Sequence, residues 1–181
     1  TSLNDHAEQI LWDGKSQGDW ASELNGADAL INLSGKSINC RFTEKNKALL
    51  LSSRLESTKA LRLAIESLDN PPKVWLNASA GAMYTPGETP NIESDKEFQS
   101  GFLSEMSLAW ENEFFKNELP NTRRVSLRIS LLLGKKGGVF PVWKKISKLL
   151  LGGAAGSGKQ KVSWMHVKDA ARAVDFLIEN I

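Results

Sequence analysis

Short apolar runs alternate with helical stripes along this chain, and this alternation constrains the fold more than any other feature of the sequence. Each of the apolar runs is short enough to be a buried strand; they cover residues 8–13, 28–34, 73–79, 125–133 and 161–167. Parallel strands cannot be joined by tight turns and need crossover connections, which are usually helical. The alternation therefore predicts an α/β fold with a doubly wound parallel sheet and helices on both faces.

Apolar residues with helical spacing fill the gaps between the predicted strands. The spacing of three and four predicts helices over residues 43–68, 102–118, 142–151 and from about 167 to the end of the chain. Residues 80–100 contain clusters of glycine, proline and acidic residues and predict a long loop of the kind that often carries function. Ligands of such sheets bind at the carboxyl ends of the strands, so the residues that follow each strand are the candidates for a site.

Composition excludes several classes of protein. The 181 residues are 41% apolar and 24% charged, which is typical of one globular domain and excludes a disordered chain or a coiled coil. A formal charge of +2, with both signs interspersed, argues against nucleic acid or an anionic membrane as the main partner. No apolar stretch approaches the roughly 20 residues that a membrane-spanning helix needs. We expect a single cytoplasmic domain over 1–181 and, because the chain opens on Thr1, a longer gene product.

The residues that most often bind metals are few and far apart. Cys40 is the sole cysteine, so an intramolecular disulfide is excluded. His6 and His166 lie far from Cys40 and from each other in the sequence, with no spacing typical of metal ligands. The sequence therefore predicts no metal site.

Two motifs of phosphate and acyl chemistry are almost present and are rejected. Residues 153–160 fit the first seven positions of the G-x-x-x-x-G-K-[ST] loop, but Gln160 stands where a hydroxyl must bind Mg²⁺. This segment also runs from a helix into a strand, opposite to a P-loop, so we interpret it as a flexible loop. Residues 77–81 approach the G-x-S-x-G elbow of serine hydrolases but lack its first glycine.

Several single residues allow both a structural and a functional interpretation. Ser79 ends a predicted strand, where a serine either faces a ligand or makes a turn or cap. His166 sits among apolar residues at a strand-to-helix junction, which favours a structural role over catalysis, and Asp169 fits a helix N-cap. The tryptophans could stack on a flat ring, but we expect most of them to build the core.

Six segments occur in an order and spacing that form one pattern over nearly the whole chain. They are Asp28 to Asn39, Ser53 to Thr58, Asn77 to Tyr84, Gly101 to Leu103 with Trp110 and Glu111, Leu127 and Arg128 with Leu133 and Gly134, and Gly156 to Gly158 with Ser163 to Asp169. The series resembles the epimerase-like branch of the extended short-chain dehydrogenase/reductases. This resemblance agrees with the alternation of strands and helices.

The resemblance implies a Rossmann-type domain that binds NAD or NADP and is related to nucleoside-diphosphate-sugar epimerases and dehydratases. It implies a small-molecule substrate such as a sugar nucleotide, and a homodimer formed through the helices at 43–68 and 102–118. The residues that choose between NAD and NADP follow the second strand of the family and have no counterpart in this chain.

The resemblance also assigns roles to particular residues. Ser79 matches the active-site serine or threonine of the family and Tyr84 the tyrosine of its S-x-x-x-x-Y-G stretch, so both are implied to be catalytic. The residues implied to contact the cofactor are Asp13, Asn32, Leu33, Ser34, Gly35, Arg54 and Arg128. Those implied on the substrate side are Lys36, Gln160 and His166.

Two departures from the family pattern leave two functions open. No G-x-G-x-x-G loop precedes Asp13, so we expect this chain as given to bind a dinucleotide poorly or not at all. The family's Tyr and Lys, four residues apart, are also missing, because Leu103 and Ser107 fall at their positions. The sequence favours an NAD(P)-dependent oxidoreductase or epimerase, with a non-catalytic nucleotide-binding or protein-interaction module as the alternative.

Overall fold

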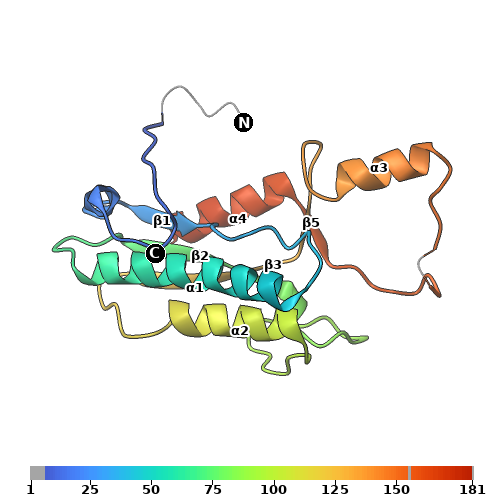
Figure 1. Ribbon diagram of the computed structural model, residues 1–181, viewed down its shortest axis with the longest axis horizontal. Helices are drawn as coiled ribbons and strands as arrows, with labels where there is room; N and C mark the ends of the chain where they lie inside the picture. The colour runs from blue at the N-terminus through green and yellow to red at the C-terminus, as the bar shows by residue number, and fades with distance from the viewer. Residues whose placement is uncertain (1–6, 155, 181) are drawn as a thin grey trace.

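The computed structural model describes residues 7–154 and 156–180, which form two parallel sheets and four α-helices (Figure 1). The first sheet has the order β1-β2-β3, formed by Ala29–Asn32, Val74–Ala80 and Arg123–Ile129. The second pairs β4 with β5, formed by Leu131–Leu133 and Trp164–His166. All of these pairings are parallel, as the alternation of elements predicts.

Helices lie on both sides of the strands (Figure 1). The α-helices are α1 (Glu44–Glu66), α2 (Phe102–Phe114), α3 (Phe140–Lys148) and α4 (Val167–Glu179), and the 3-10 helices are η1 (Asp19–Leu24) and η2 (Gly81–Met83). Figure 1 shows α1 and α2 side by side below the first sheet and α4 above it. The predicted α/β class with parallel strands and helices on both faces is thus confirmed.

The core lies between the first sheet and the helix pair α1 and α2. Trp75 of β2 is fully buried, and its ring meets the ring of Phe114 edge-on at a centroid distance of 4.6 Å. Leu61 and Ile65, one turn apart on α1, complete this cluster. The apolar stripes predicted for 43–68 and 102–118 therefore face each other and the central strand β2. This packing fixes the position of the strand ends.

The predicted strand over 125–133 is wrong as a single element, because Ser130 belongs to neither strand and separates β3 from β4. Pairing between β2 and β3 ends at Ala80 and Ile129, where β2 passes into η2. Beyond that point β2 offers no backbone partner, and Leu131 to Leu133 pair with β5 instead. An apolar run carries no information about which strand its residues pair with.

The predicted strand over 8–13 is also wrong, since the described residues from 7 onward form bends and irregular backbone there. The side chain of Leu11 is 98% exposed, so the apolar character of this run does not reflect burial in a sheet. Trp12 instead packs on Trp20 at a ring distance of 4.7 Å, against the outside of the core cluster. A strand needs a hydrogen-bonded neighbour, and none of the described strands takes this segment as one.

The expectation that most of the tryptophans build the core is confirmed. Trp75 and Trp110 are buried, and Trp12 and Trp20 pack on the core, but Trp143 and Trp164 are exposed.

In the part of the chain that the structure describes, no helix has the length and apolar character needed to cross a membrane.

Candidate functional site

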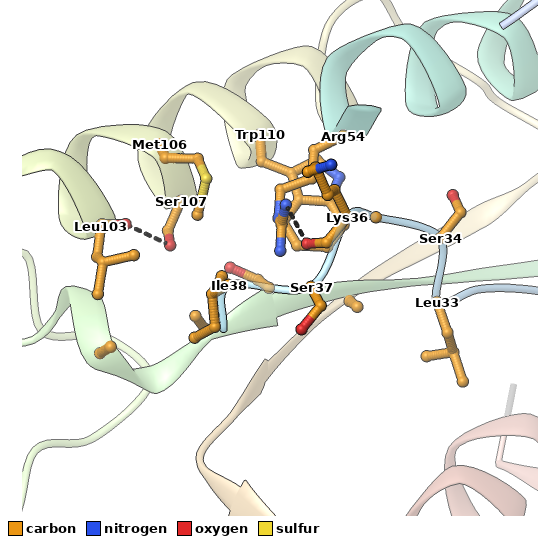
Figure 2. Close-up of a pocket in the computed structure, with 15 residues that line it drawn as sticks. Leu33, Ser34, Lys36, Ser37, Ile38, Arg54, Leu103, Met106, Ser107 and Trp110 are labelled. Atoms are coloured by element: carbon orange, nitrogen blue, oxygen red, sulfur yellow. Dashed lines mark hydrogen bonds between the residues drawn. The ribbon is translucent and has the colours of Figure 1, made fainter. Parts of the chain in front are cut away.

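A cleft of about 370 Å³ opens where β1 and β2 end, at the edge of the sheet where ligands of parallel α/β folds bind (Figure 2). Three segments and one helix residue line it: residues 33–38 after β1, the end of β2 with the start of η2, the inner face of α2, and Arg54 of α1. Most of these positions come from the loop after β1 and from α2, so the cleft lies between a strand end and a helix.

The loop after β1 is held by Asn32, which is buried at the end of the strand. The Asn32 amide nitrogen donates to Asn77 Oδ1 at 2.6 Å, across the register pair that joins β1 to β2. Asn32 Oδ1 accepts a hydrogen bond from the backbone N–H of Ser34 at 3.1 Å. These bonds hold the start of the loop that lines the cleft with residues 33–38. Asn32 therefore shapes the site without lining it.

Arg54 carries its guanidinium to the cleft from the third turn of α1. Its Nη1 donates to the carbonyl oxygens of Leu50 at 2.9 Å and Lys36 at 3.2 Å, and its Cζ lies 5.2 Å from the ring centre of Trp110. Burial lowers the pKa of the Arg54 guanidinium. Gly35 permits this packing, because a Cβ at that position would lie only 3.3 Å from Arg54 Cζ.

A buried carboxylate, Glu111 of α2, stands behind the cleft and collects hydrogen bonds from three strand residues. Its Oε1 accepts from the hydroxyls of Ser79 at 2.6 Å and Ser126 at 2.8 Å. Arg128 of β3 donates to both of its oxygens, from Nε at 3.0 Å and from Nη2 at 2.9 Å. Burial alone would raise the pKa of Glu111, but the hydrogen bonds from Arg128, Ser79 and Ser126 outweigh burial and lower it.

The arrangement around Glu111 determines what Ser79 and Tyr84 can offer a ligand. Ser79, which is among the lining residues, gives its hydroxyl proton to Glu111, so its Oγ can serve a further partner only as a hydrogen-bond acceptor. Arg128 Nη1 donates to Tyr84 Oη at 2.6 Å, which leaves the phenolic hydrogen of Tyr84 free to be donated elsewhere. The Tyr84 ring also packs on Phe98 and under the Arg128 guanidinium, just outside the residues that line the cleft.

The face of α2 that lines the cleft carries neither a phenol nor an amine. Leu103, Met106, Ser107 and Trp110 are the lining residues from this helix. Ser107 Oγ donates to the Leu103 carbonyl at 2.8 Å, and Trp110 Nε1 donates to Thr58 Oγ1 at 2.8 Å. Leu103 and Ser107, which fall at the positions of the family's tyrosine and lysine, thus both face the cleft (Figure 2). Proton transfer by a Tyr and Lys pair on this helix is not available to the chain.

The structure brings six of the predicted site residues together at the cleft: Leu33, Ser34, Gly35, Lys36, Arg54 and Ser79. Three others support the cleft from behind or beside it: Asn32, Tyr84 and Arg128. The remaining three, Asp13, Gln160 and His166, are exposed and do not line it. The residues nearest the ends of β1 and β2 are therefore the ones that converge.

The residues that stay outside the cleft have local structural partners. Asp13 accepts hydrogen bonds from the backbone N–H groups of Ser16 at 2.8 Å and Lys15 at 2.9 Å, and these bonds lower its pKa to about 2. His166 caps α4, since its Nδ1 accepts from the backbone N–H of Lys168 at 3.2 Å. The expected cap Asp169 was wrong: it lies inside the first turn of α4 and pairs with Arg172 instead.

Glu111 is the site residue that sequence reasoning did not select. A weak signal for it exists, because Glu111 is the acidic residue beside the apolar stripe of Met106, Trp110 and Phe114 and lies one turn after Ser107. A carboxylate at the border of a buried stripe needs partners, and those partners come from β2 and β3. Within residues 7–154 and 156–180, no group of three or more His, Cys, Asp or Glu side chains is arranged to hold a metal ion.

Comparison with known proteins gives one consistent result. The family model described as the NAD dependent epimerase/dehydratase family matches residues 4–181. The epimerase family protein YfhF of Bacillus subtilis is 38% identical over 159 residues, which are 87% of this chain and 52% of that protein. The epimerase family protein SSP1921 of Staphylococcus saprophyticus is 35% identical over 175 residues, which are 96% of this chain and 58% of that protein. The chain thus spans about half the length of the curated relatives it matches.

Solved structures with the same fold are also similar over most of the chain. The human epimerase family protein SDR39U1 (isoform 2), crystallised with NADPH, matches with a TM-score of 0.79 and 32% identity, covering 88% of this chain and 57% of that one. The UDP-glucuronic acid 4-epimerase of Bacillus cereus, in complex with UDP-glucuronic acid and NAD, matches with a TM-score of 0.70 and 17% identity, covering 90% and 52%. The second likeness concerns the fold alone.

Proposed function

The chain belongs to the NAD dependent epimerase/dehydratase family, and from that membership we propose that it forms the NAD(P)-binding part of an oxidoreductase or epimerase that acts on a small molecule such as a sugar nucleotide. The observation that carries the proposal is the cleft at the ends of β1 and β2, where six of the residues assigned from the sequence converge. The human relative that was crystallised with NADPH supports the choice of ligand class.

The residues at the cleft fit one end of a nicotinamide dinucleotide. A volume of about 370 Å³ suits a ring with its sugar but not a whole dinucleotide. Residues 33–36 and Arg54 would hold this end, with backbone and charge respectively. When bound, the cofactor supplies the hydride chemistry. The rest of the dinucleotide needs a pyrophosphate site, which no glycine-rich turn of this sequence provides.

The chain's own groups would then orient the substrate and move a proton. Ser79 presents an acceptor oxygen, so it suits a substrate hydroxyl or an amide N–H as its partner. Tyr84 keeps a free phenolic hydrogen beside the Arg128 guanidinium and is the group we assign to proton transfer. Glu111 and Arg128 act through these two residues and are therefore positioning residues.

The residues of α2 that line the cleft favour a second function. Leu103 and Ser107 face the cleft where the family has its tyrosine and lysine, so the cleft also suits a module that binds nucleotide without turning it over. The two functions are separable, because the binding module predicts cofactor binding with no hydride transfer to any sugar nucleotide or carbonyl compound.

We further propose that residues 1–181 form one Rossmann-like domain that is completed by residues outside this sequence. The relatives are about twice as long, and among the described strands β1 has a neighbour on one side only. We also expect a cytoplasmic protein that forms a homodimer through α1 and α2, as the family resemblance implies.

The deciding experiment is a thermal-shift titration with NADH and NADPH. It compares the 181-residue chain with the full-length protein encoded by the same gene. We expect both cofactors to leave the shorter chain nearly unchanged and one of them to raise the Tm of the full-length protein by several degrees at saturation. No shift in either protein would refute cofactor binding. Hydride transfer is then followed at 340 nm with a panel of sugar nucleotides, which separates the enzyme from the binding module.

A further inference from the structure

We propose that Arg54, together with Lys36 and the hydroxyl of Ser37, forms a phosphate-binding site at the cleft (Figure 2). The inference deepens the proposed function, on which it rests, by naming the group that the cleft recognises. The phosphate would belong either to the dinucleotide or to a sugar nucleotide.

Arg54 is a buried cation without a counter-charge among the described residues. It is 9% exposed, and no carboxylate of the described residues forms an ion pair with it. Buried arginines are almost always paired, because an unpaired buried charge is costly. The same helix provides the contrast, since Arg62 is similarly buried but pairs with Glu66 at 2.8 Å and Glu113 at 3.0 Å.

The Arg54 guanidinium uses only one of its nitrogens in hydrogen bonds to the described residues. Its Nη1 is held by two carbonyl oxygens, those of Leu50 and Lys36, which fix the plane of the guanidinium. Its Nε has no acceptor among the described residues, although it is buried. Because Nε is shielded from solvent, as are the equally unpartnered Nε atoms of Arg62 and Arg123, a ligand in the cleft would meet the outer N–H groups of a guanidinium whose plane is already fixed.

The charge of the residues that line the cleft favours an anion. No acidic side chain is among the residues that line it, and Lys36 adds a second cation at its rim. The nearest buried acid, Glu111, is neutralised by Arg128 on the far side of Ser79. Two cations, serine hydroxyls and loop backbone suit a phosphate, which carries more charge and more acceptor oxygens than a carboxylate.

Arg54 fits closely against the loop after β1, which it would share with the ligand. A Cβ on residue 35 would lie 3.3 Å from Arg54 Cζ, and the indole of Trp110 covers the guanidinium at 5.2 Å. Because residue 35 has no side chain, the loop backbone and the Arg54 guanidinium can lie beside the same part of the cleft. The ligand group would meet both at once.

The first test uses inorganic pyrophosphate as the probe and thermal stabilisation of the full-length protein and of this chain as the readout. We expect Arg54→Gln to bind pyrophosphate about tenfold or more weakly than the wild type does. Arg54→Lys should lose less affinity, because it keeps the charge but loses the fork of N–H groups. Lys59→Gln is the matched control, because it removes an exposed cation from the same helix outside the cleft. Each variant is compared with its own Tm without ligand.

Lys36→Gln keeps the inference testable even where Arg54→Gln does not fold, because Lys36 is exposed and its removal leaves the core intact. It is expected to weaken pyrophosphate binding by about threefold. Equal affinities in wild type, Lys36→Gln and Arg54→Lys would overturn the proposal, and so would a wild type that pyrophosphate does not stabilise.

The source of the phosphate is found with two matched pairs of ligands. Nicotinamide mononucleotide is compared with nicotinamide riboside, and UDP-glucose with uridine, each by calorimetry on wild type and Arg54→Gln. If Arg54→Gln loses affinity for nicotinamide mononucleotide but not for nicotinamide riboside, the phosphate belongs to the cofactor. If it loses affinity for UDP-glucose but not for uridine, the phosphate belongs to the substrate. Equal loss of both members in each pair contradicts a phosphate site. If NADH and NADPH fail to bind but pyrophosphate binding depends on Arg54, the proposed function fails while the phosphate site stands.

Discussion

The two halves of the molecule differ sharply in burial. All the buried residues that the structure describes lie at or before Thr122, within β1, β2, α1, α2, the segments that join them and the segment that follows α2. After Thr122, the described residues of β4, β5, α3 and α4 include no buried side chain. The residues that line the cleft lie between 33 and 110, so its walls belong to the packed half, whereas Ser126 and Arg128, which hold Glu111 behind it, belong to β3.

The difference does not come from weaker apolar patterns in the second half. Phe140, Trp143 and Ile146 form an apolar stripe on α3, yet each is exposed. Phe114 of α2 belongs to a similar stripe and is fully buried against Trp75. A stripe of apolar residues therefore predicts a helix and a face, but burial depends on whether a second element reaches that face.

The largest effect is expected from removing a large side chain in the packed half. Phe114→Ala should lower the free energy of unfolding by about 3–5 kcal/mol, because it opens a cavity between α2 and Trp75. Phe176→Ala on α4, where the side chain is 62% exposed, should cost less than about 1 kcal/mol. Urea denaturation measures both. Similar losses in the two variants would mean that the halves are equally well packed.

The second effect compares a buried ion pair with an exposed one. Glu111→Ala should cost about 2–4 kcal/mol, because it leaves the Arg128 guanidinium and two serine hydroxyls without their acceptor. Glu88→Ala removes the partner of Lys161, and both of these side chains are largely exposed, so the loss should stay below about 1 kcal/mol. A small cost for Glu111→Ala would show that the cluster is not essential to the packed half.

The same carboxylate should make the stability depend on pH. The folded-state pKa of Glu111 lies below its usual value, so its contribution is fully present above the unfolded pKa of about 4.3 and is lost as the pH falls through the folded pKa. The difference in stability between wild type and Glu111→Gln should therefore shrink on acidification below about pH 4. Denaturation curves between pH 3 and 7 give the result. A difference that is constant across this range would exclude the linkage.

The smallest effect belongs to the second half. Leu150, just after α3, has φ of 57°, a left-handed conformation that favours glycine, and its side chain is 91% exposed. Leu150→Gly should stabilise the protein by about 0.5 kcal/mol, since relief of the backbone strain slightly exceeds the added flexibility of the unfolded chain. Calorimetry would detect the small rise in Tm. A fall in Tm would indicate that the Leu150 side chain is packed in solution.

Much of the fold follows from the sequence. The helices over Glu44–Glu66 and Phe102–Phe114 agree with the predicted ranges to within a few residues, because their apolar spacing is long and regular. The strand over Val74–Ala80 is equally clear, since it is apolar and bounded by prolines and a glycine. Local patterns decide such elements.

The remaining features depend on partners that are distant in the sequence. The break at Ser130 arises because β2 ends beside it, and the exposed Leu11 lies in a short apolar run that joins no described sheet. For the site, the strand-end rule finds Ser34, Gly35 and Ser79, because it uses topology alone. It does not find Glu111, whose importance comes from hydrogen bonds to residues 32 and 17 positions away.

The order of the strands in the first sheet also bears on how the chain is assembled. Because β1, β2 and β3 are neighbours in space in the same order as in the sequence, each can add to the edge left by the previous one as the chain is synthesised. Glu111 reaches Ser79 once α2 has docked, but its pairing with Arg128 must wait until β3 emerges. The hydrogen-bonded cluster around Glu111 is thus completed only by the last strand of the sheet. A nascent chain that stops before β3 has the residues that line the cleft but lacks the Arg128 guanidinium that pairs with Glu111 behind them.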